Sequence, residues 1–198
     1  MNGKPELYGL IGSRICHDLI SPLGAIGNGV ELLTMSGMNG MPEIALISES
    51  IENANARIRF FRIAFGASSD TAQIANTELQ SVLRDLYRGN RVKAEWRVTG
   101  DLARREAKLA FLAILCVESA LPFGGTILVT RTGDCWHVSG TAERLKIDPD
   151  LWAHLEGLGA PDTVKPPEVQ FALVGPEATA QGRKVAVQRR EGNVTISF

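Results

Sequence analysis

His17 lies in a stretch of the sequence that is unusual for a helix. The stretch from Ile15 to Leu33 reads ICHDLISPLGAIGNGVELL, with apolar residues at helical spacing, a proline at position 22 and glycines at positions 24, 27 and 29. Each interior glycine costs a helix about 0.5–1 kcal/mol relative to alanine, and proline removes a backbone hydrogen bond. This cost around a single histidine indicates that the residues near it serve chemistry or docking.

A helical wheel places His17 away from the apolar face. At about 100° per residue, the histidine falls nearly opposite a sector about 120° wide that holds the apolar residues Ile11, Leu19, Leu23, Ile26, Val30 and Leu33. Ser21, Gly24 and Asn28 lie beside the histidine, and Arg14 lies one turn before it. We therefore expect the imidazole to face outward, among small or polar neighbours that leave clearance for a docking protein.

Close contact between helices is the alternative explanation for the glycines. It suits Gly27 and Gly29, which lie nearer the flanks of the apolar sector. It does not suit Gly24, because that residue lies on the face of the histidine, where a contact within a helical bundle would not need it.

The residues around His17 restrict its chemistry. An imidazole is nucleophilic near neutral pH and can carry a covalent group, and the neighbouring Asp18 can accept its proton or fix its tautomer. Metal binding would need further ligands, but no second histidine at helical spacing and no cysteine pair accompanies His17. Cys16 points about 100° away from it, and no motif of a serine hydrolase is present. These exclusions leave a phosphorylatable histidine.

The composition is that of a folded protein without an electrostatic preference for nucleic acid. The chain has 198 residues, of which 44% are hydrophobic and 22% charged, and its formal net charge is −1. Its three cysteines, Cys16, Cys116 and Cys135, are odd in number and far apart, which favours a reducing compartment. We expect a cytoplasmic location and no membrane partner, because neither an export signal nor an apolar run of about 20 residues is evident.

Residues 1–67 are expected to form an antiparallel helical hairpin. The helix that carries His17 is followed by a second helix with a seven-residue repeat of apolar residues, at positions 44, 47, 51, 54, 58, 61 and 65. A hairpin with two apolar seams cannot bury both of them alone. We therefore expect a homodimer in which two hairpins form a four-helix bundle.

Residues 74–198 follow a polar linker and are expected to form a mixed domain. Alternating apolar residues predict a strand over 92–98, with further strands at 126–131 and 136–141 and helices over 79–87 and 105–121. Asp148 and Pro149 can cap and begin a short helix, and the C-terminus reads as a hairpin with its turn at 191–193. The prediction is an α+β sandwich with helices on one face of a mostly antiparallel sheet.

The segment HDLISPL, from His17 to Leu23, resembles the H-box of two-component histidine kinases. The longer stretch HDLISPLGAIGNGVELL is similar to the ChpT-type histidine phosphotransferases of alphaproteobacteria. This resemblance implies a dimerisation hairpin followed by a domain of the histidine-kinase ATP-binding type. It also implies that His17 is the phosphoacceptor and that Asp18 orients or deprotonates its imidazole. Ser21 stands where kinases usually have Thr or Asn, which argues against an autonomous phosphatase activity.

The resemblance further implies partners in a phosphorelay. In the family, the histidine receives a phosphoryl group from an aspartate on the receiver domain of a CckA-like hybrid kinase. It passes the group to an aspartate of CtrA-like or CpdR-like response regulators. Docking along the face of Ser21, Gly24 and Asn28 is then expected, with Arg14 as a candidate for pairing the charge of the phosphohistidine. The alternative for Arg14 is an ordinary solvated side chain.

The second domain lacks the motifs that would let such a domain bind ATP. Leu115 and Ser119 occupy the probable positions of two magnesium-binding asparagines, no Asp-x-Gly-x-Gly follows the strand at Trp136, and the glycines of LVGPEATAQGRK are scattered. Without oxygen ligands for Mg²⁺, ATP-dependent transfer loses its main electrostatic support. We predict a degenerate ATPase domain with no intrinsic cofactor, and Mg²⁺ supplied by the partner receiver domain.

Two other functions remain open at the level of the sequence. An active ATP-dependent histidine kinase would label His17 from ATP without a partner. A non-catalytic protein that binds a response regulator would keep its effect on that regulator when His17 is replaced by alanine.

Overall fold

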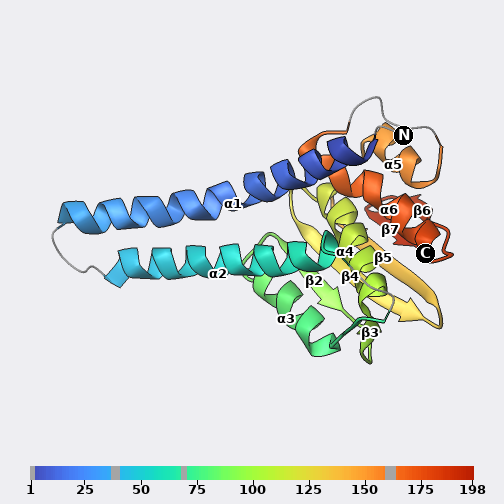
Figure 1. Cartoon of the computed structure of the whole chain (residues 1–198), viewed down its shortest axis with the longest axis horizontal. Coiled ribbons are helices and arrows are strands. Elements are labelled where there is room, and N and C mark those ends of the chain that lie inside the picture. Colours follow the sequence, from blue (N-terminus) through green and yellow to red (C-terminus); the bar gives the residue numbers. More distant parts are fainter. Residues whose placement is uncertain (1–2, 37–40, 68–70, 159–163) are drawn as a thin grey trace.

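The first two helices form a hairpin that projects from the rest of the chain. The computed structural model describes residues 3–36, 41–67, 71–158 and 164–198. Helix α1 (Gly3–Ser36) and helix α2 (Met41–Ala64) lie side by side, and their linked ends point away from the second domain (Figure 1). The expected loop between them falls mostly outside the described residues. The structure therefore has the predicted hairpin, while the dimeric bundle stays a prediction.

A five-stranded sheet forms one layer of the second domain. Its strands, in spatial order, are β2 (Val92–Trp96), β4 (Gly125–Thr132), β5 (Cys135–Thr141), β7 (Asn193–Ser197) and β6 (Ala186–Arg190). Only the β2–β4 pairing is parallel, and the other three are antiparallel. The expectation of a mostly antiparallel sheet is confirmed.

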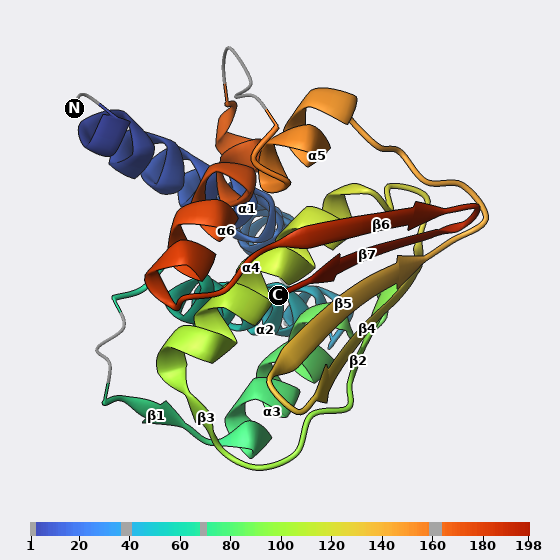
Figure 2. The same ribbon diagram turned by 90° about the vertical axis from the view of Figure 1, so that its right-hand side faces the viewer.

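The helices of this domain cover one face of the sheet, as Figure 2 shows. They are α3 (Asn76–Tyr87), α4 (Arg104–Ser119), α5 (Pro149–Leu155) and α6 (Val169–Ala180), with a short 3₁₀ helix, η1 (Pro166–Glu168), before α6. A separate antiparallel pair, β1 (Gln73–Ile74) with β3 (Leu102–Ala103), joins the start of α3 to the start of α4.

Helix α4 lies at the centre of the core, and the base of the hairpin packs on it. All α4 residues from Leu109 to Val117 are buried, which fits a helix with contacts on every side. Phe60 and Ile63 of α2 are buried in the same core, and the Phe60 and Phe111 rings lie 4.7 Å apart. The base of α2 is therefore continuous with the core of the second domain, which fixes the hairpin relative to the sheet.

The sequence predicted most elements of this domain but not all of them. The Asp148 side chain accepts hydrogen bonds from the backbone N–H groups of Asp150 and Leu151, so the predicted cap is confirmed. The C-terminal hairpin is also confirmed, and Gly192 in its turn has a φ of 65°, which glycine adopts without strain. Helix α6 was not predicted, because its sequence contains Gly175 and Pro176. No helix in the described part of the chain is long and apolar enough to cross a membrane.

Candidate functional site

The predicted site lies on α1, where the hairpin meets the second domain. The backbone of His17 belongs to α1, but its side chain lies outside the described residues. The surroundings of the histidine are therefore defined by its neighbours along the helix. Ser21 is exposed, Pro22 is buried, and Asp18 and Arg14 are largely covered.

Asp18 carries its carboxylate between two arginines. Arg14 donates a hydrogen bond from Nε to Oδ2 of Asp18 at 2.8 Å, one turn along α1. Arg57 of α2 places a guanidinium nitrogen 3.8 Å from the same oxygen. Only 10% of the Asp18 side chain is exposed. Charge-assisted contacts of this kind hold a partly buried carboxylate in one orientation. The residue next to His17 is thus positioned by both helices of the hairpin.

Arg14 also ties α1 to the second domain. Its guanidinium donates a hydrogen bond to the carbonyl oxygen of Pro167 in η1, and 14% of its side chain is exposed. Of the residues predicted to face a docking partner, Arg14 is thus engaged within the chain itself. Ser21, Gly24 and Asn28 are all exposed.

Gly24 and Gly27 of α1 both face open surroundings. A Cβ atom added at Gly24 or at Gly27 would meet nothing within 4 Å. Gly27 therefore serves no close contact within a single chain. Gly24 lies on the face of Ser21 and Asn28, where the open space fits the clearance that the sequence predicts.

A cleft of about 450 Å³ opens between the two hairpin helices beside this face. Its wall is formed by α1, α2 and the loop after α3, and includes Asp18, Ser21, Pro22, Ser50, Arg57 and Asn90. The cleft lies next to the backbone position of His17, and both polar and apolar groups line it. It gives a partner protein access to this part of α1.

A second, smaller cleft of about 240 Å³ continues from the first one toward α4. Arg57 and Asn90 line both clefts, and Glu118, near the end of α4, lines the second. The Tyr87 hydroxyl donates a hydrogen bond to Oε2 of Glu118 at 3.0 Å. Burial raises the pKa of the Glu118 carboxyl, and the Tyr87 hydrogen bond with the charges of Arg57 and Arg14 offsets part of this rise. Burial raises the pKa of the Tyr87 hydroxyl as well.

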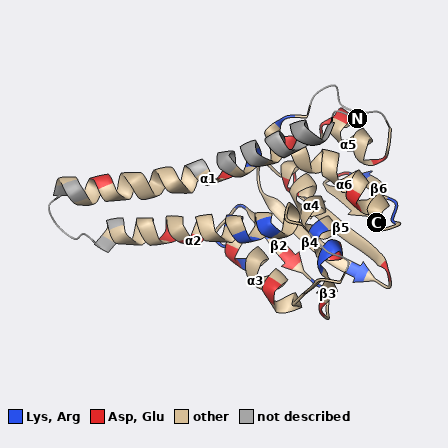
Figure 3. Ribbon diagram, in the orientation of Figure 1, with Lys and Arg blue, Asp and Glu red and all other residues tan. Residues whose placement is uncertain are grey.

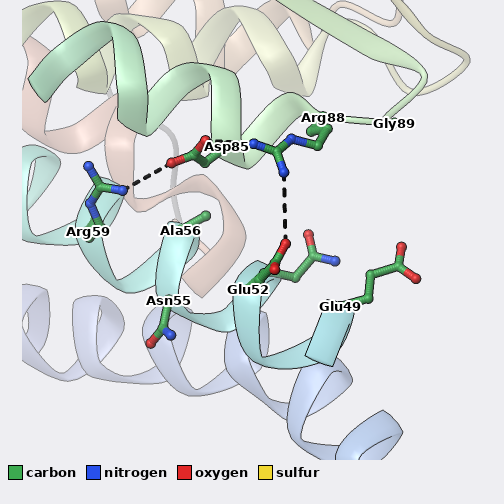
Figure 4. Close-up of a pocket in the computed structure, with 9 residues that line it drawn as sticks. Glu49, Glu52, Asn55, Ala56, Arg59, Asp85, Arg88 and Gly89 are labelled. Carbon is green, nitrogen blue, oxygen red and sulfur yellow. Dashed lines mark hydrogen bonds and ion pairs between the residues drawn. The ribbon is translucent and has the colours of Figure 1, made fainter. Parts of the chain in front are cut away.

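Ion pairs join α2 to α3 on the neighbouring surface. Asp85 of α3 accepts hydrogen bonds from Arg59 of α2 and from Arg88, each at 3.1 Å, and Arg88 also lies 3.8 Å from Glu52 (Figure 4). Figure 3 shows that the basic residues of α2 gather on the half of the helix beside the second domain. These contacts fix the base of the hairpin against α3.

The positions expected for magnesium-binding asparagines hold a core leucine and a serine. Leu115 is 4% exposed and belongs to the core, and the Ser119 hydroxyl donates to the Cys116 carbonyl at 2.6 Å. Across the described residues, no group of three His, Cys, Asp or Glu side chains could hold a metal ion. Cys116 and Cys135 are free thiols, and the side chain of Cys16 lies outside the described residues.

Comparison with known proteins places this geometry in a family. Residues 76–193 match the model of the histidine phosphotransferase C-terminal domain. The chain belongs to this family of histidine phosphotransferases. The match covers the second domain, in which Glu118 and Tyr87 lie.

Two individual relatives agree with this family. Protein phosphotransferase ChpT of Brucella abortus (strain 2308) is 40% identical over 130 residues, which are 65% of this chain and 62% of that protein. The chain thus aligns with less than two thirds of the length of that relative. A solved bacterial phosphotransferase superposes with a TM-score of 0.83 at 31% identity, covering 98% of this chain and 96% of the other. The resemblance to ChpT-type proteins is confirmed.

Sequence reasoning did not predict Arg57, Asn90 or Glu118 as parts of the site. The only signal for Arg57 is its place outside the apolar repeat of α2, between Ala54 and Ile58. Many solvent-exposed arginines lie at such positions, so this signal does not single out Arg57. The contact with Asp18 depends on how two helices pack, which the spacing of residues along one helix does not encode.

Proposed function

We propose that this protein carries a phosphoryl group on His17 between the receiver domains of other proteins. A nitrogen of the imidazole uses its lone pair to form a bond to the phosphorus of an aspartyl phosphate. The bond from phosphorus to the aspartate oxygen breaks, and the receiver regains its carboxylate. The same exchange in reverse moves the group to the aspartate of a response regulator. The upstream donor is a CckA-like hybrid kinase receiver, and CtrA-like and CpdR-like regulators are the acceptors.

The arrangement around Asp18 is the observation that carries this proposal. Its carboxylate lies beside the backbone of His17 and is held by Arg14 and Arg57, while Ser21 and Gly24 leave the adjacent face open. A fixed acid can orient an imidazole, and an open face lets a receiver bring its aspartyl phosphate close. Phosphoryl transfer depends mainly on such positioning and on charge neutralisation.

We further propose that the transfer needs no ATP and no metal held by this chain. Leu115 is buried in the core where a magnesium-binding asparagine would be needed. The Mg²⁺ that neutralises the phosphoryl charge then comes with the receiver domain, whose carboxylates are suitable ligands.

A homodimer is part of the same proposal. Both hairpin helices expose large apolar side chains at seven-residue spacing, between 44% and 58% exposed: Leu23 and Val30 on α1, and Ile44, Ile51 and Ile58 on α2. We call these residues the apolar stripe. Apolar surface repeated along two adjacent helices is typical of an interface, and a second hairpin supplies a matching surface.

The test is incubation of the purified protein with a receiver domain phosphorylated on its aspartate. The expected product is a label on the protein that is lost in acid and kept in base, as for a phosphoramidate. His17→Ala abolishes the label. His137→Ala and His154→Ala, which remove the other two histidines of the chain, leave it in place.

Three outcomes would overturn the proposal. If His17→Ala keeps the label, the phosphoacceptor is another residue. If the protein alone becomes labelled from radioactive ATP, the chain is a kinase. If the His17→Ala variant still controls the response regulator, the protein acts by binding the regulator and not by phosphotransfer.

A further inference from the structure

Charged groups alternate in sign from the predicted phosphoacceptor segment into the second domain. Arg14 and Asp18 lie on α1, Arg57 on α2 and Glu118 on α4. Both arginines contact the same oxygen, Oδ2 of Asp18. A nitrogen of Arg14 lies 2.8 Å from this oxygen, and a nitrogen of Arg57 lies 3.8 Å from it. Three helices from both parts of the chain thus contribute to one polar cluster.

Arg57 is the link between the two ends of this cluster. It lines the cleft that holds Asp18 and also the cleft that holds Glu118. Its side chain is 36% exposed, so part of the guanidinium faces the solvent that fills these clefts. One guanidinium has five N–H donors in a rigid planar arrangement, so it can interact with two carboxylate groups at once.

Glu118 is held on its other side by the core of the second domain. The Tyr87 hydroxyl donates to it at 3.0 Å, and Tyr87 is 6% exposed. A tyrosine fixed by packing gives this carboxylate one preferred position. Arg57 and Glu118 line the same cleft, which places the guanidinium near this carboxyl group.

We propose that Arg57 is a positioning residue for phosphotransfer, through which Glu118 of the second domain sets the orientation of Asp18 next to His17. This inference rests on the proposed function. It gives the second domain a task that needs no nucleotide: its buried acid lies in the cleft that Arg57 lines, and Arg57 pairs with the acid that follows the phosphoacceptor.

Arg59 supplies a matched control. It lies two residues further along α2, its side chain is also 36% exposed, and it forms an ion pair with Asp85 of the second domain at 3.1 Å. The cleft lined by Asp18 does not include it. A general loss of contact between the hairpin and the second domain would affect both arginines alike.

The experiment measures transfer from a phosphorylated receiver domain to the full chain, at several receiver concentrations. We expect Arg57→Ala to lower the rate at saturating receiver by about tenfold, with a half-saturating concentration within about twofold of the wild type. Arg57→Lys restores the charge and returns the rate to within about threefold, and Arg59→Ala stays within about twofold. Thermal unfolding of each variant shows whether it is folded.

A second measurement tests the link to Glu118. Glu118→Gln lowers the transfer rate, and adding it to Arg57→Ala causes no further decrease, because both changes break the same connection. If the fold-decrease in the double variant equals the product of the two single fold-decreases, Arg57 does not act together with Glu118.

The outcomes separate this inference from the proposed function. If the wild-type protein is not labelled on His17, the proposed function itself is wrong. If the wild type is labelled and Arg57→Ala matches Arg59→Ala, or loses only receiver affinity, then Arg57 is not a positioning residue.

Discussion

Arg14 on α1 donates a hydrogen bond to the carbonyl oxygen of Pro167, 153 residues later in the chain. The same guanidinium holds Asp18 at 2.8 Å. The residue that orients the predicted catalytic acid therefore also anchors α1 on η1 of the second domain. Beside the site, Arg14 thus joins the hairpin to the second domain, and Arg57 lines a cleft between the two.

The first prediction concerns this anchor. Arg14→Ala removes a largely covered cation from Asp18 and leaves a carbonyl without its donor, so we expect a loss of about 1–3 kcal/mol in the free energy of unfolding. Urea unfolding measures it. Arg62→Ala is the control, because Arg62 is 62% exposed and pairs with Glu78 at the surface. A surface pair is worth about 0–1 kcal/mol. Equal losses in the two variants would contradict the anchoring role of Arg14.

The second prediction concerns the pH dependence of stability at Glu118. Burial raises the pKa of this carboxyl in the folded state above its unfolded value of about 4.3. Between the unfolded and the folded pKa, the folded state binds more protons than the unfolded state. The wild type therefore loses stability as the pH rises from the lower pKa to the higher one. The glutamine side chain in the Glu118→Gln variant does not titrate. The stability of this variant relative to wild type should therefore rise as the pH increases above the unfolded pKa of about 4.3.

Urea unfolding of both proteins at each pH checks this sign. Parallel pH dependence would show that the Glu118 carboxyl titrates as it does in the unfolded chain. The same unfolding curves at neutral pH show whether Glu118→Gln is folded, so that slower phosphotransfer by this variant can be separated from unfolding.

The sequence predicted elements well where one local signal was sufficient. Asp148 followed by Pro149 marks a helix start by its chemistry alone, and the alternation around Trp96 marks a strand. It failed at α6, where Pro176 masks a helix whose Val174 and Ala178 are buried against the core.

The site itself was predictable only in part. The H-box residues are contiguous, so the motif is visible in the sequence. The wheel of an isolated helix cannot show that η1 covers Arg14, nor that Arg57 reaches Asp18, because these contacts depend on tertiary packing. Residues that join distant segments carry no local pattern.

A third prediction concerns the packing of α4 against the sheet. A Cβ atom at Gly140 of β5 would lie 2.5 Å from a methyl carbon of Val117. Gly140→Ala should therefore destabilise the protein by about 1–3 kcal/mol through overpacking. Gly175→Ala is the control, since a Cβ in that helical position meets nothing within 4 Å and should be neutral or stabilising by up to about 1 kcal/mol. Denaturant unfolding compares them, and an unchanged Gly140→Ala variant would contradict the close approach.

A fourth prediction tests the docking face. Gly24→Ala should stabilise α1 by about 0.5–1 kcal/mol, because the added methyl group meets open space. Gly24→Leu should keep the fold but raise the half-saturating concentration of a phosphorylated receiver by about tenfold, since the larger side chain occupies the docking face. Transfer kinetics combined with thermal unfolding separate the two effects. Unchanged kinetics for Gly24→Leu would place receiver docking elsewhere.

The fifth prediction tests the apolar stripe. Val30 and Ile51 are 52% and 45% exposed, on α1 and α2. Burying a charge in an apolar interface is costly unless the charge is paired, so Val30→Glu combined with Ile51→Glu should convert a dimer into a monomer. Sedimentation equilibrium at micromolar concentration measures the mass. Leu158→Glu is the matched control, because Leu158 is 66% exposed and lies outside the stripe, in the second domain. A wild-type protein that sediments as a monomer, or a dimer that survives both glutamates, would contradict the four-helix bundle, since the stripe would then be covered by something other than a second hairpin.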